Sequence, residues 1–223
     1  MNIINAKDIQ QQHLTVLIYG TPGMGKTSLL GNLPGRTLIL DFDRGTSVLA
    51  GCEHVDIARV PINNRDIWEA VNELKASCPY DNVALDSFSE LERAILGNMA
   101  ANNSLGIPTK QDYGKINIIM HNVCRQMRDI NANIFFTAWE QYTDIIAPNG
   151  DKYSRIEPLI RDKNMSQVTG LCDIVGRIYL DLDTQTRRVW LEGRPNVVAK
   201  DRVFKRQSCN FEEVIHNGTM DTL

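Results

Sequence analysis

A glycine-rich segment near the N-terminus has the residue types and the spacing that bind phosphate. Residues 20–27 read GTPGMGKT and satisfy the pattern G-x-x-x-x-G-K-[ST]. Glycines at these positions let the backbone turn sharply and point N–H groups at phosphate oxygens, while the lysine reaches the β- and γ-phosphates and the last hydroxyl ligates Mg²⁺. The pattern therefore predicts ATP and Mg²⁺ as cofactors. The predicted nucleotide-binding residues are Gly20, Thr21, Pro22, Gly23, Met24, Gly25, Lys26, Thr27 and Ser28.

The residues on either side predict the elements that hold this loop. Residues 16–19 form a short apolar run, which favours a strand, and apolar side chains return at helical spacing from Ser28 to Leu33. A strand before the loop and a helix after it form the context in which the pattern binds phosphate, and the positive end of the helix adds to the attraction. A glycine-rich turn with an incidental lysine is the alternative.

Another predicted strand ends in an acid. Residues 83–85 are apolar and lead into Asp86, whose carboxylate would hold Mg²⁺ through water, together with Thr27. Ser87 follows Asp86, so no glutamate stands beside it to act as a general base. The catalytic carboxylate has to come from elsewhere in the sequence.

The strand after the predicted phosphate-binding helix supplies candidates for that base. Residues 37–40 favour a strand whose end carries Asp41 and Asp43, and the sheet would bring these carboxylates beside the phosphate site. Either of them could orient or deprotonate the water that attacks the γ-phosphate. The alternative is a solvated strand end followed by a turn.

The composition is that of an ordinary globular protein. The chain has 223 residues, of which 43% are hydrophobic and 23% are charged, and its formal net charge is -3. These values fit one α/β domain and give no overall electrostatic signature of nucleic-acid binding. Any nucleic-acid site must be local, and the basic stretch from Arg187 to Arg206 qualifies. A solvated hairpin face is the alternative for that stretch.

Cysteine usage and the N-terminal residues bear on location. The five cysteines are widely spaced and form no C-x-x-C pair, which favours reduced thiols. Residues 1–15 lack the basic and apolar regions of a signal peptide, and no apolar run is long enough to span a membrane. We therefore expect a cytoplasmic protein with no membrane partner.

Apolar periodicity predicts the fold. Predicted strands alternate with predicted helices up to about residue 141, which indicates an α/β fold with a mostly parallel sheet covered by helices on both faces. Antiparallel strands are added at the C-terminal end, at about 176–204. The whole chain, 1–223, is expected to form a single domain with its core at about 14–180.

Two segments are expected to be long loops. Residues 97–115 and 142–166 are polar and contain many turn-forming residues, and a helix is expected only from about Ile116 to Arg128. APNGDK, at 147–152, predicts a turn. The C-terminal strands are expected at 176–183, 187–193 and 196–203, the first two as a hairpin.

Three of these segments together resemble the RecA-like ATPases. LILDFD, VALDS and IFFTAWEQ occur in the order in which that family has its catalytic acid, its Walker B strand and its polar sensor strand. More narrowly, the chain resembles phage-encoded RecA-like nucleotide-binding proteins, a group that includes the Sak-type single-strand annealing ATPases. The matching segments also include GTPGMGKTSL, TGLCDIVGRIYL and VAKDRV, so the resemblance extends over roughly residues 14–203.

The resemblance implies roles for individual residues. Lys26 and Asp86 would act on the phosphates and on Mg²⁺ during catalysis, and Asp43 is the preferred catalytic carboxylate. RecA-like proteins usually have glutamate there, so the shorter aspartate implies slower hydrolysis. Either Glu140 or Gln141 would sense the γ-phosphate.

The resemblance also implies a role for VAKDRV. Lys200 and Arg202 would reach the phosphates of a neighbouring subunit, as arginine-finger residues do. Two outward charges that protect an edge strand are the alternative. Self-association into a ring or a filament follows from the first interpretation.

DNA is the partner that the resemblance implies. The loops expected at 97–115 and 142–166 lie where RecA-like proteins contact DNA. Single-strand binders combine cations with aromatic side chains on which bases stack. The candidates for such contacts are Tyr113, Lys115, Tyr142, Lys152, Tyr153 and Arg155, while Trp139 is expected in the core.

The expected function is an ATPase that binds single-stranded DNA and promotes annealing or strand pairing in phage recombination, in the cytoplasm of a bacterial host. A single-strand-binding protein is implied as a further partner. The alternative is a nucleotide-gated loader or assembly factor in phage DNA replication that acts on a protein. A small-molecule kinase is disfavoured because the sequence offers no arginine-rich lid.

Overall fold

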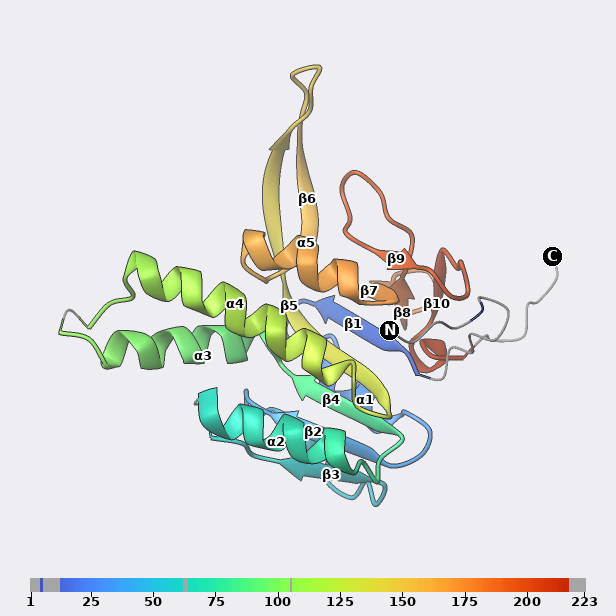
Figure 1. The fold of residues 1–223 in the computed structure, drawn as a ribbon. Coiled ribbons are helices and arrows are strands. Elements are labelled where there is room, and N and C mark those ends of the chain that lie inside the picture. Colours follow the sequence, from blue (N-terminus) through green and yellow to red (C-terminus); the bar gives the residue numbers. More distant parts are fainter. Residues whose placement is uncertain (1–4, 6–12, 62–63, 105, 217–223) are drawn as a thin grey trace.

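The chain folds around one mixed sheet (Figure 1). The computed structural model describes residues 5, 13–61, 64–104 and 106–216. Within those residues ten strands are hydrogen-bonded in the order β10-β8-β7-β1-β5-β4-β2-β3, with β6 paired to β5 and β9 to β7. The strands are β1 (Thr15–Gly20), β2 (Thr37–Asp41), β3 (Val55–Ala58), β4 (Asn82–Asp86), β5 (Asn133–Ile146), β6 (Lys152–Pro158), β7 (Ile174–Asp181), β8 (Thr186–Trp190), β9 (Lys200–Asp201) and β10 (Ser208–Asn210). The helices are α1 (Lys26–Gly31), α2 (Asn64–Ala76), α3 (Phe88–Ala101), α4 (Lys110–Met127) and α5 (Asp162–Leu171), with 3₁₀ helices η2 (Thr46–Leu49) and η3 (Phe211–Glu213).

The central strands form the parallel part of the sheet. β7, β1, β5, β4, β2 and β3 pair in parallel, in that order. β1, β2 and β4 are buried along their whole length, as expected for parallel strands with both faces covered. β8 and β9 pair antiparallel with β7, β10 with β8, and β6 with β5. The predicted α/β fold, mostly parallel with antiparallel strands at the C-terminal end, is confirmed.

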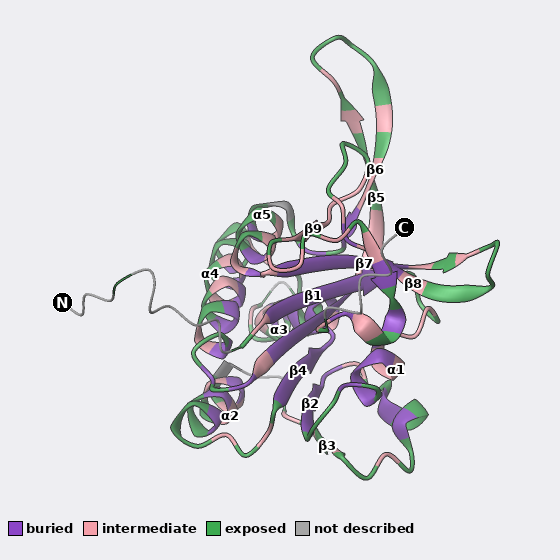
Figure 2. Cartoon of the chain, turned by 90° about the vertical axis from the view of Figure 1, so that its right-hand side faces the viewer, coloured by how far each residue is buried: buried purple, intermediate pink, exposed green. Residues whose placement is uncertain are grey.

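Each face of the sheet buries its own apolar layer. Leu17 of β1 packs in a cluster with apolar residues of α2, α3 and α4, whereas its neighbour Ile18 packs with residues of α1 and with Phe211 and Val214. The two neighbours differ because successive side chains of a strand point to opposite faces. Figure 2 shows the buried strands between α1 on one side and α2 and α4 on the other. The C-terminal residues therefore help to cover the α1 face.

The described helices are amphipathic and short. α4 has 18 residues, of which Ile116, Met120, Val123 and Met127 are buried at helical spacing on one side. No helix in the described part of the chain combines the length and the apolar character needed to cross a membrane. The expectation of one domain over 1–223 stays a prediction.

The expected long loop at 97–115 is wrong. α3 continues to Ala101 and α4 begins at Lys110, so only residues 102–109 connect them. Thr109 begins α4 with a capping box, in which its hydroxyl accepts from the Asp112 N–H and its own N–H donates to the Asp112 carboxylate. Figure 1 shows α3 and α4 extending beyond the sheet. Much of their surface meets solvent there, which explains the polar sequence.

The second expected loop, 142–166, is wrong as well. β5 continues to Ile146, turns at 147–151 into β6, and α5 begins at Asp162. The turn predicted for APNGDK is confirmed, because the Gly150 N–H donates to the Ala147 carbonyl at 2.8 Å. Residues 140–158, here called the β5–β6 arm, project from the body in both views (Figures 1 and 2). Since only Glu157 and Pro158 at its base are buried, the sequence of the arm has no continuous apolar run.

The C-terminal strands match the prediction in part. The first two form the predicted hairpin, with Leu180 opposite Arg187. The third is reduced to the two residues of β9, because Val197 forms bridges with Ile156 and Arg194 instead of pairing with β7. β10 was not predicted.

Candidate nucleotide-binding site

The GTPGMGKT segment forms a tight loop at the carboxyl end of β1. β1 lies between β5 and β7, and α1 begins at Lys26, directly after the loop. Gly23 and Gly25 have φ angles of 84° and 92°, a left-handed conformation that other residues rarely adopt. The loop therefore requires glycine at both positions. It lies at the carboxyl ends of the parallel strands, where open α/β sheets bind their ligands.

Lys26 lies across the loop. Its ammonium group donates to the carbonyl oxygens of Gly20 at 2.9 Å and of Thr21 at 3.1 Å. Burial lowers the pKa of Lys26, and nearby carboxylates oppose that effect. They are, in order of strength, Asp86, Asp43 and Glu140. Lys26 is thus a buried cation at the loop, in a position to meet phosphate oxygens.

Thr27 and Asp86 are in direct contact. The Thr27 hydroxyl donates to Asp86 Oδ2 at 2.7 Å, and the Thr137 hydroxyl donates to Asp86 Oδ1. A hydroxyl and one carboxylate suit Mg²⁺, which keeps several waters and takes further ligands from phosphates. Among the residues that the structure describes, no group of three or more His, Cys, Asp or Glu side chains could hold a metal. Thr27 and Asp86 would therefore hold Mg²⁺ together with the nucleotide.

The charged Asp86 carboxylate is expected to lower the stability of the folded protein in the absence of Mg²⁺. Burial raises the pKa of its carboxyl group, although the hydroxyls of Thr137 and Thr27 oppose the shift. A carboxyl group with a raised pKa in the folded state favours folding below its unfolded pKa, and this contribution is lost as pH rises through the folded pKa. We therefore expect Asp86→Asn to raise the melting temperature of the nucleotide-free protein at pH 8 by about 2–4 °C, and by less at pH 5.

Thermal unfolding followed by fluorescence measures this effect, with and without Mg²⁺ and ATP. The same variant should lose the stabilisation that Mg²⁺ and ATP give to the unmodified protein. If Asp86→Asn lowered the melting temperature at both pH values, this would contradict the view that the buried Asp86 carboxylate destabilises the protein when Mg²⁺ is absent.

The two aspartates at the end of β2 have different surroundings. Asp41 is buried and in register with Asp86; its Oδ2 accepts from the Thr46 hydroxyl at 2.7 Å, and its Oδ1 has no hydrogen-bond partner among the described residues. Asp43 is partly exposed, and its charge raises the pKa of both Lys26 and Asp86. Both aspartates lie at the edge of the sheet where the loop lies, and the Asp43 carboxylate is the more accessible one.

β5 points Glu140 and Gln141 to opposite faces of the sheet. Glu140 makes a bidentate ion pair with Arg177, at 2.7 and 3.3 Å, and its negative charge acts on Lys26. Gln141 donates to Glu157 at 3.2 Å. The structure therefore brings Glu140 to the phosphate-binding loop and does not bring Gln141 there. The sensor role stays a prediction.

Lys200 and Arg202 lie away from the loop of their own chain. Both donate to the carbonyl oxygen of Gly170 in the last turn of α5, at 3.3 and 2.7 Å. β9 pairs with the first residues of β7, whereas the loop follows the last residue of β1. Within the chain these cations stabilise the end of α5. Their contact with a neighbouring subunit's phosphates stays a prediction.

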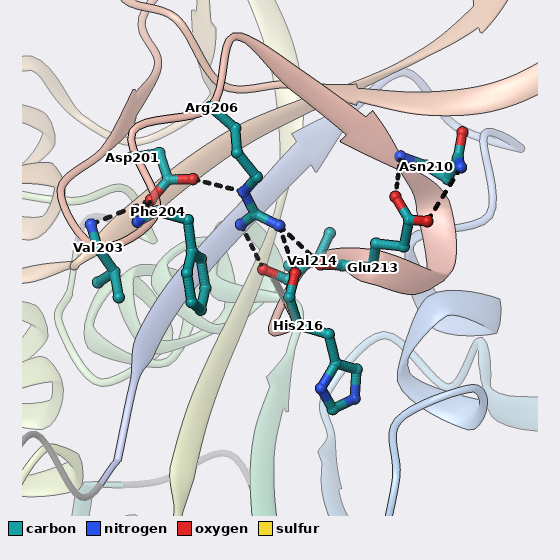
Figure 3. A network of polar contacts seen from close by, with 8 residues as sticks. All are labelled: Asp201, Val203, Phe204, Arg206, Asn210, Glu213, Val214 and His216. Carbon is teal, nitrogen blue, oxygen red and sulfur yellow. Dashed lines mark hydrogen bonds and ion pairs between the residues drawn. The ribbon is translucent and has the colours of Figure 1, made fainter. Parts of the chain in front are cut away.

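The basic stretch from Arg187 to Arg206 does not form one patch. Arg206 donates to the Asp201 carboxylate at 2.7 Å and to three backbone carbonyls near the C-terminal end of the described chain (Figure 3). Arg194 bonds to Glu192. Arg194 and Arg206 are therefore engaged within the C-terminal segment, so the stretch is neither a single basic patch nor a uniformly solvated hairpin face.

Two arginines near the loop were not predicted as site residues. Arg177 pairs with Glu140, as described above, and Arg187 stands beside Gly25, with a guanidinium nitrogen 3.1 Å from the position that a Cβ would occupy. In the sequence, Arg187 stands out only as part of the basic stretch. Its place follows from the pairing of β8 with β7, which brings it to the loop from far along the chain.

A cavity lined by basic and aromatic side chains, here called the basic cavity, lies on the face of β5 opposite to Glu140. Its volume is about 680 Å³, and it is lined by α3, α4, β5, the segment 159–161 and Lys163 of α5. The cations that line it are Arg93, Lys110, Arg161 and Lys163. Glu92, the one acid among its lining residues, already accepts from the Asn164 amide and from a backbone N–H. Since four cations face one acid among the lining residues, the net charge of the cavity lining is positive.

Aromatic side chains also line the basic cavity. Arg161 stacks on the ring of Tyr113 at 4.4 Å, and Trp139 is half-buried at the cavity wall instead of lying in the core as expected. Of the other residues predicted to contact DNA, Lys115 has its ammonium group 3.9 Å from the Asp112 carboxylate. The remaining four, Tyr142, Lys152, Tyr153 and Arg155, lie on the β5–β6 arm.

The chain is similar to known proteins in sequence and in structure. A family model described as an AAA domain matches residues 12–203. A KaiC-like protein from the hyperthermophilic archaeon Pyrococcus horikoshii OT3 is 12% identical, with a TM-score of 0.42 over 79% of this chain and 77% of that one. A prototypical ATPase from the type III secretion system of pathogenic bacteria is 15% identical, with a TM-score of 0.44 over 77% of this chain.

The extent of these matches differs. This chain spans about half the length of the secretion ATPase, since 53% of that chain is covered. No curated protein matches the sequence. The family model, by contrast, covers most of this chain and includes the loop, Asp86 and the strands that follow. The chain belongs to the AAA-domain family of P-loop ATPases.

Proposed function

We propose that the protein is a Mg²⁺-dependent RecA-like ATPase that binds single-stranded DNA and promotes annealing or strand pairing in phage recombination. One observation carries the proposal. Residues 139–141 of β5 connect the two sites: Glu140 acts on Lys26 of the nucleotide-binding loop, whereas its neighbours Trp139 and Gln141 line the basic cavity on the opposite face. Binding of ATP can therefore act directly on the groups that would hold DNA.

The chain supplies groups for each part of ATP hydrolysis. Backbone N–H groups of residues 20–28, Pro22 excepted, would hold the phosphates, and Lys26 would neutralise charge on the β- and γ-phosphates. Mg²⁺, held by Thr27 and Asp86, would offset the charge that develops during transfer. Asp43 would orient or deprotonate the attacking water. Its reach is one methylene shorter than that of glutamate, which fits slow turnover.

Glu140 fits the sensor role better than Gln141 does. Its negative charge acts on Lys26, and its carboxylate is held by Arg177. A γ-phosphate beside Lys26 would repel Glu140 and attract Arg177, and so weaken the ion pair. Because Glu140 is the first residue of the β5–β6 arm, a movement at this point reaches the arm.

Ser89 connects the magnesium site with the basic cavity. It stands three residues after Asp86 and lines the cavity. Its hydroxyl accepts from the Trp139 N–H at 3.0 Å and donates to the Leu159 carbonyl at 2.8 Å. A shift of the end of β4 on binding Mg²⁺ would therefore be felt by Trp139 and by the residues after β6.

The basic cavity has the chemistry of a single-strand site. Cations at its rim suit the phosphates of a nucleic-acid backbone, and Tyr113 and Trp139 offer rings on which bases stack. The Asn117 amide also lines it, with a buried Oδ1 that has no partner among the described residues. A rotation of the Asn117 side chain toward the cavity would let that oxygen accept a hydrogen bond from a base.

Replacing cations of the basic cavity is expected to weaken DNA binding and its salt dependence. For a single strand, each phosphate that is no longer neutralised should reduce the slope of log affinity against log salt by about 0.7. We therefore expect Lys110→Ala combined with Lys163→Ala to reduce the slope by about 1.4 and to lower the affinity for a single-stranded oligonucleotide. Fluorescence anisotropy of a labelled oligonucleotide at several salt concentrations measures both quantities.

Arg125→Ala is the matched control, since it removes an exposed cation from the far end of α4. Equal slopes for the double variant and the control would argue against the basic cavity as the DNA site. Their melting temperatures should match that of the unmodified protein.

Self-association completes the proposal. Lys200 and Arg202 share one carbonyl acceptor, so either can be released to a neighbouring subunit's phosphates at small cost. A ring or a filament would bring them there. A single-strand-binding protein as partner and a bacterial cytoplasm as location rest on the resemblance to phage proteins.

A loader or assembly factor that acts on a protein in phage DNA replication is the second candidate. The β5–β6 arm favours it, since Tyr142 is 60% and Ile146 is 69% exposed on a projecting hairpin. Apolar side chains at such a place suit a protein partner. ATP binding without any affinity for DNA would support this candidate over the first.

A further inference from the structure

Arg187 differs from its neighbours in the basic stretch. Arg188 donates to Ser208 at 3.0 Å, and Arg206 is surrounded by acceptors. The Arg187 side chain is exposed, and its guanidinium group forms no hydrogen bond or ion pair with any residue that the structure describes. It is therefore a cation without an acceptor in the nucleotide-free chain.

The sheet fixes where this cation stands. Arg187 lies opposite Leu180 of β7, and β8 is held on its other edge by β10. A Cβ built on Gly25 would lie 3.1 Å from an Arg187 nitrogen, 3.4 Å from its guanidinium carbon and 3.5 Å from the Phe211 ring. Since Phe211 is buried and Arg187 is exposed, Phe211 supports the loop and Arg187 lies at the open side of this contact.

We propose that Arg187 is a phosphate ligand of the nucleotide site, supplied by the same chain. The inference rests on the proposed nucleotide binding and adds a residue that neither the loop pattern nor the resemblance assigns. A guanidinium group fits phosphate oxygens with two parallel hydrogen bonds. With no partner to give up, Arg187 can turn to a bound phosphate chain without breaking an existing hydrogen bond.

The charges around the loop favour such a ligand. Asp43, Asp86 and Glu140 all act on Lys26, so the loop already holds more negative than positive side chains. Arg177 offsets Glu140 by pairing with it. A nucleoside triphosphate stays negative when it carries one Mg²⁺, and a second free cation at the loop would balance it. Arg187 is placed to do so.

This role would make the C-terminal strands part of the nucleotide site. Arg187 is held by β7 and β10, and the Arg206 network ties β10 and η3 to the segment that contains β9. A contact between Arg187 and phosphate would therefore tie β9, which carries Lys200, to the nucleotide bound by its own chain. The segment 200–202, which carries both cations proposed for the neighbouring subunit, would thus respond to nucleotide.

Isothermal titration with ATP and with ADP, at fixed Mg²⁺, tests the proposal. Arg187→Ala is expected to lower the affinity for ATP by about 10- to 100-fold, and Arg187→Lys is expected to recover part of the loss. The melting temperature without nucleotide and the affinity for single-stranded DNA without nucleotide should not change, because Arg187 has no partner in the free chain. Arg188→Ala, on the same strand, is the control and should keep its ATP affinity.

Each other outcome has a distinct meaning. Unchanged ATP affinity in Arg187→Ala, with the affinity lost in Lys26→Ala, would overturn the role of Arg187 and leave the nucleotide site intact. A loss of ATP affinity that comes with a lower melting temperature and no recovery by lysine would also overturn it, in favour of structural support. No ATP binding by the unmodified protein would overturn the proposed function itself.

Discussion

Replacing Lys26 by alanine is expected to lower the affinity for ATP by about two orders of magnitude. The ammonium group is the buried cation of the phosphate-binding loop, and its removal leaves the charges of Asp86 and Asp43 uncompensated where the phosphates would bind. Uncompensated carboxylates would repel the nucleotide as well. Isothermal titration of ATP in the presence of Mg²⁺ measures the change.

Lys75→Ala is the matched control for this variant. Lys75 lies on α2 and donates to Gln126 and Asp129, so its removal takes away one cation without touching the loop. We expect its ATP affinity to equal that of the unmodified protein. Equal affinities of Lys26→Ala and Lys75→Ala would mean that the GTPGMGKT loop does not bind ATP.

Asp43→Asn is expected to lower the rate of ATP hydrolysis by about 10²- to 10⁴-fold, the usual contribution of a general base. ATP affinity should be retained or slightly raised, since the variant removes a negative charge near Lys26. Phosphate release at saturating ATP measures the rate. An unchanged rate would show that Asp43 is not the catalytic carboxylate.

Two further variants separate catalysis from structure. Asp43→Glu lengthens the side chain by one methylene and is expected to keep or raise the rate. Asp41→Asn changes a buried carboxylate that is bonded to Thr46, and it should alter stability more than rate. A larger loss of rate in Asp41→Asn than in Asp43→Asn would move the catalytic role to Asp41.

The elements that hold the nucleotide site could be predicted because their sequence signals are local. The strand, the turn that requires glycine and the helix of the loop are consecutive in the chain, and Asp86 ends a fully buried strand. Burial on both faces makes such strands continuous apolar runs. The same reasoning found the end of β2, which Asp43 follows, and the buried first half of β5, which leads to Glu140.

The elements that extend away from the sheet could not be predicted in the same way. α3, α4 and the β5–β6 arm have large solvent-facing surfaces, so their polar residues were mistaken for loops. β3 was missed for a related reason: it is the edge strand, and none of its four residues is fully buried. The capping box of Thr109 was a local signal that would have moved the start of α4 to its observed place.

Some groups reach the nucleotide site from distant parts of the chain, and their positions depend on how the strands pair. Arg177 and Arg187 reach the loop because β7 lies beside β1 and β8 lies beside β7. Neither contact has a signal in the sequence near the loop. The choice between Glu140 and Gln141 likewise needed the register of β5 with β1, in which Gly20 lies opposite Trp139.

Binding of single-stranded DNA in the presence and absence of ATP tests the central claim most directly. A labelled oligonucleotide would be titrated with the unmodified protein, with Mg²⁺ and ATP, with Mg²⁺ and ADP, and with Mg²⁺ alone, each at two salt concentrations. We expect binding that is tightest with ATP and weaker at the higher salt concentration. Equal affinity under all three nucleotide conditions, or no binding at either salt concentration, would contradict an ATP-controlled single-strand binder.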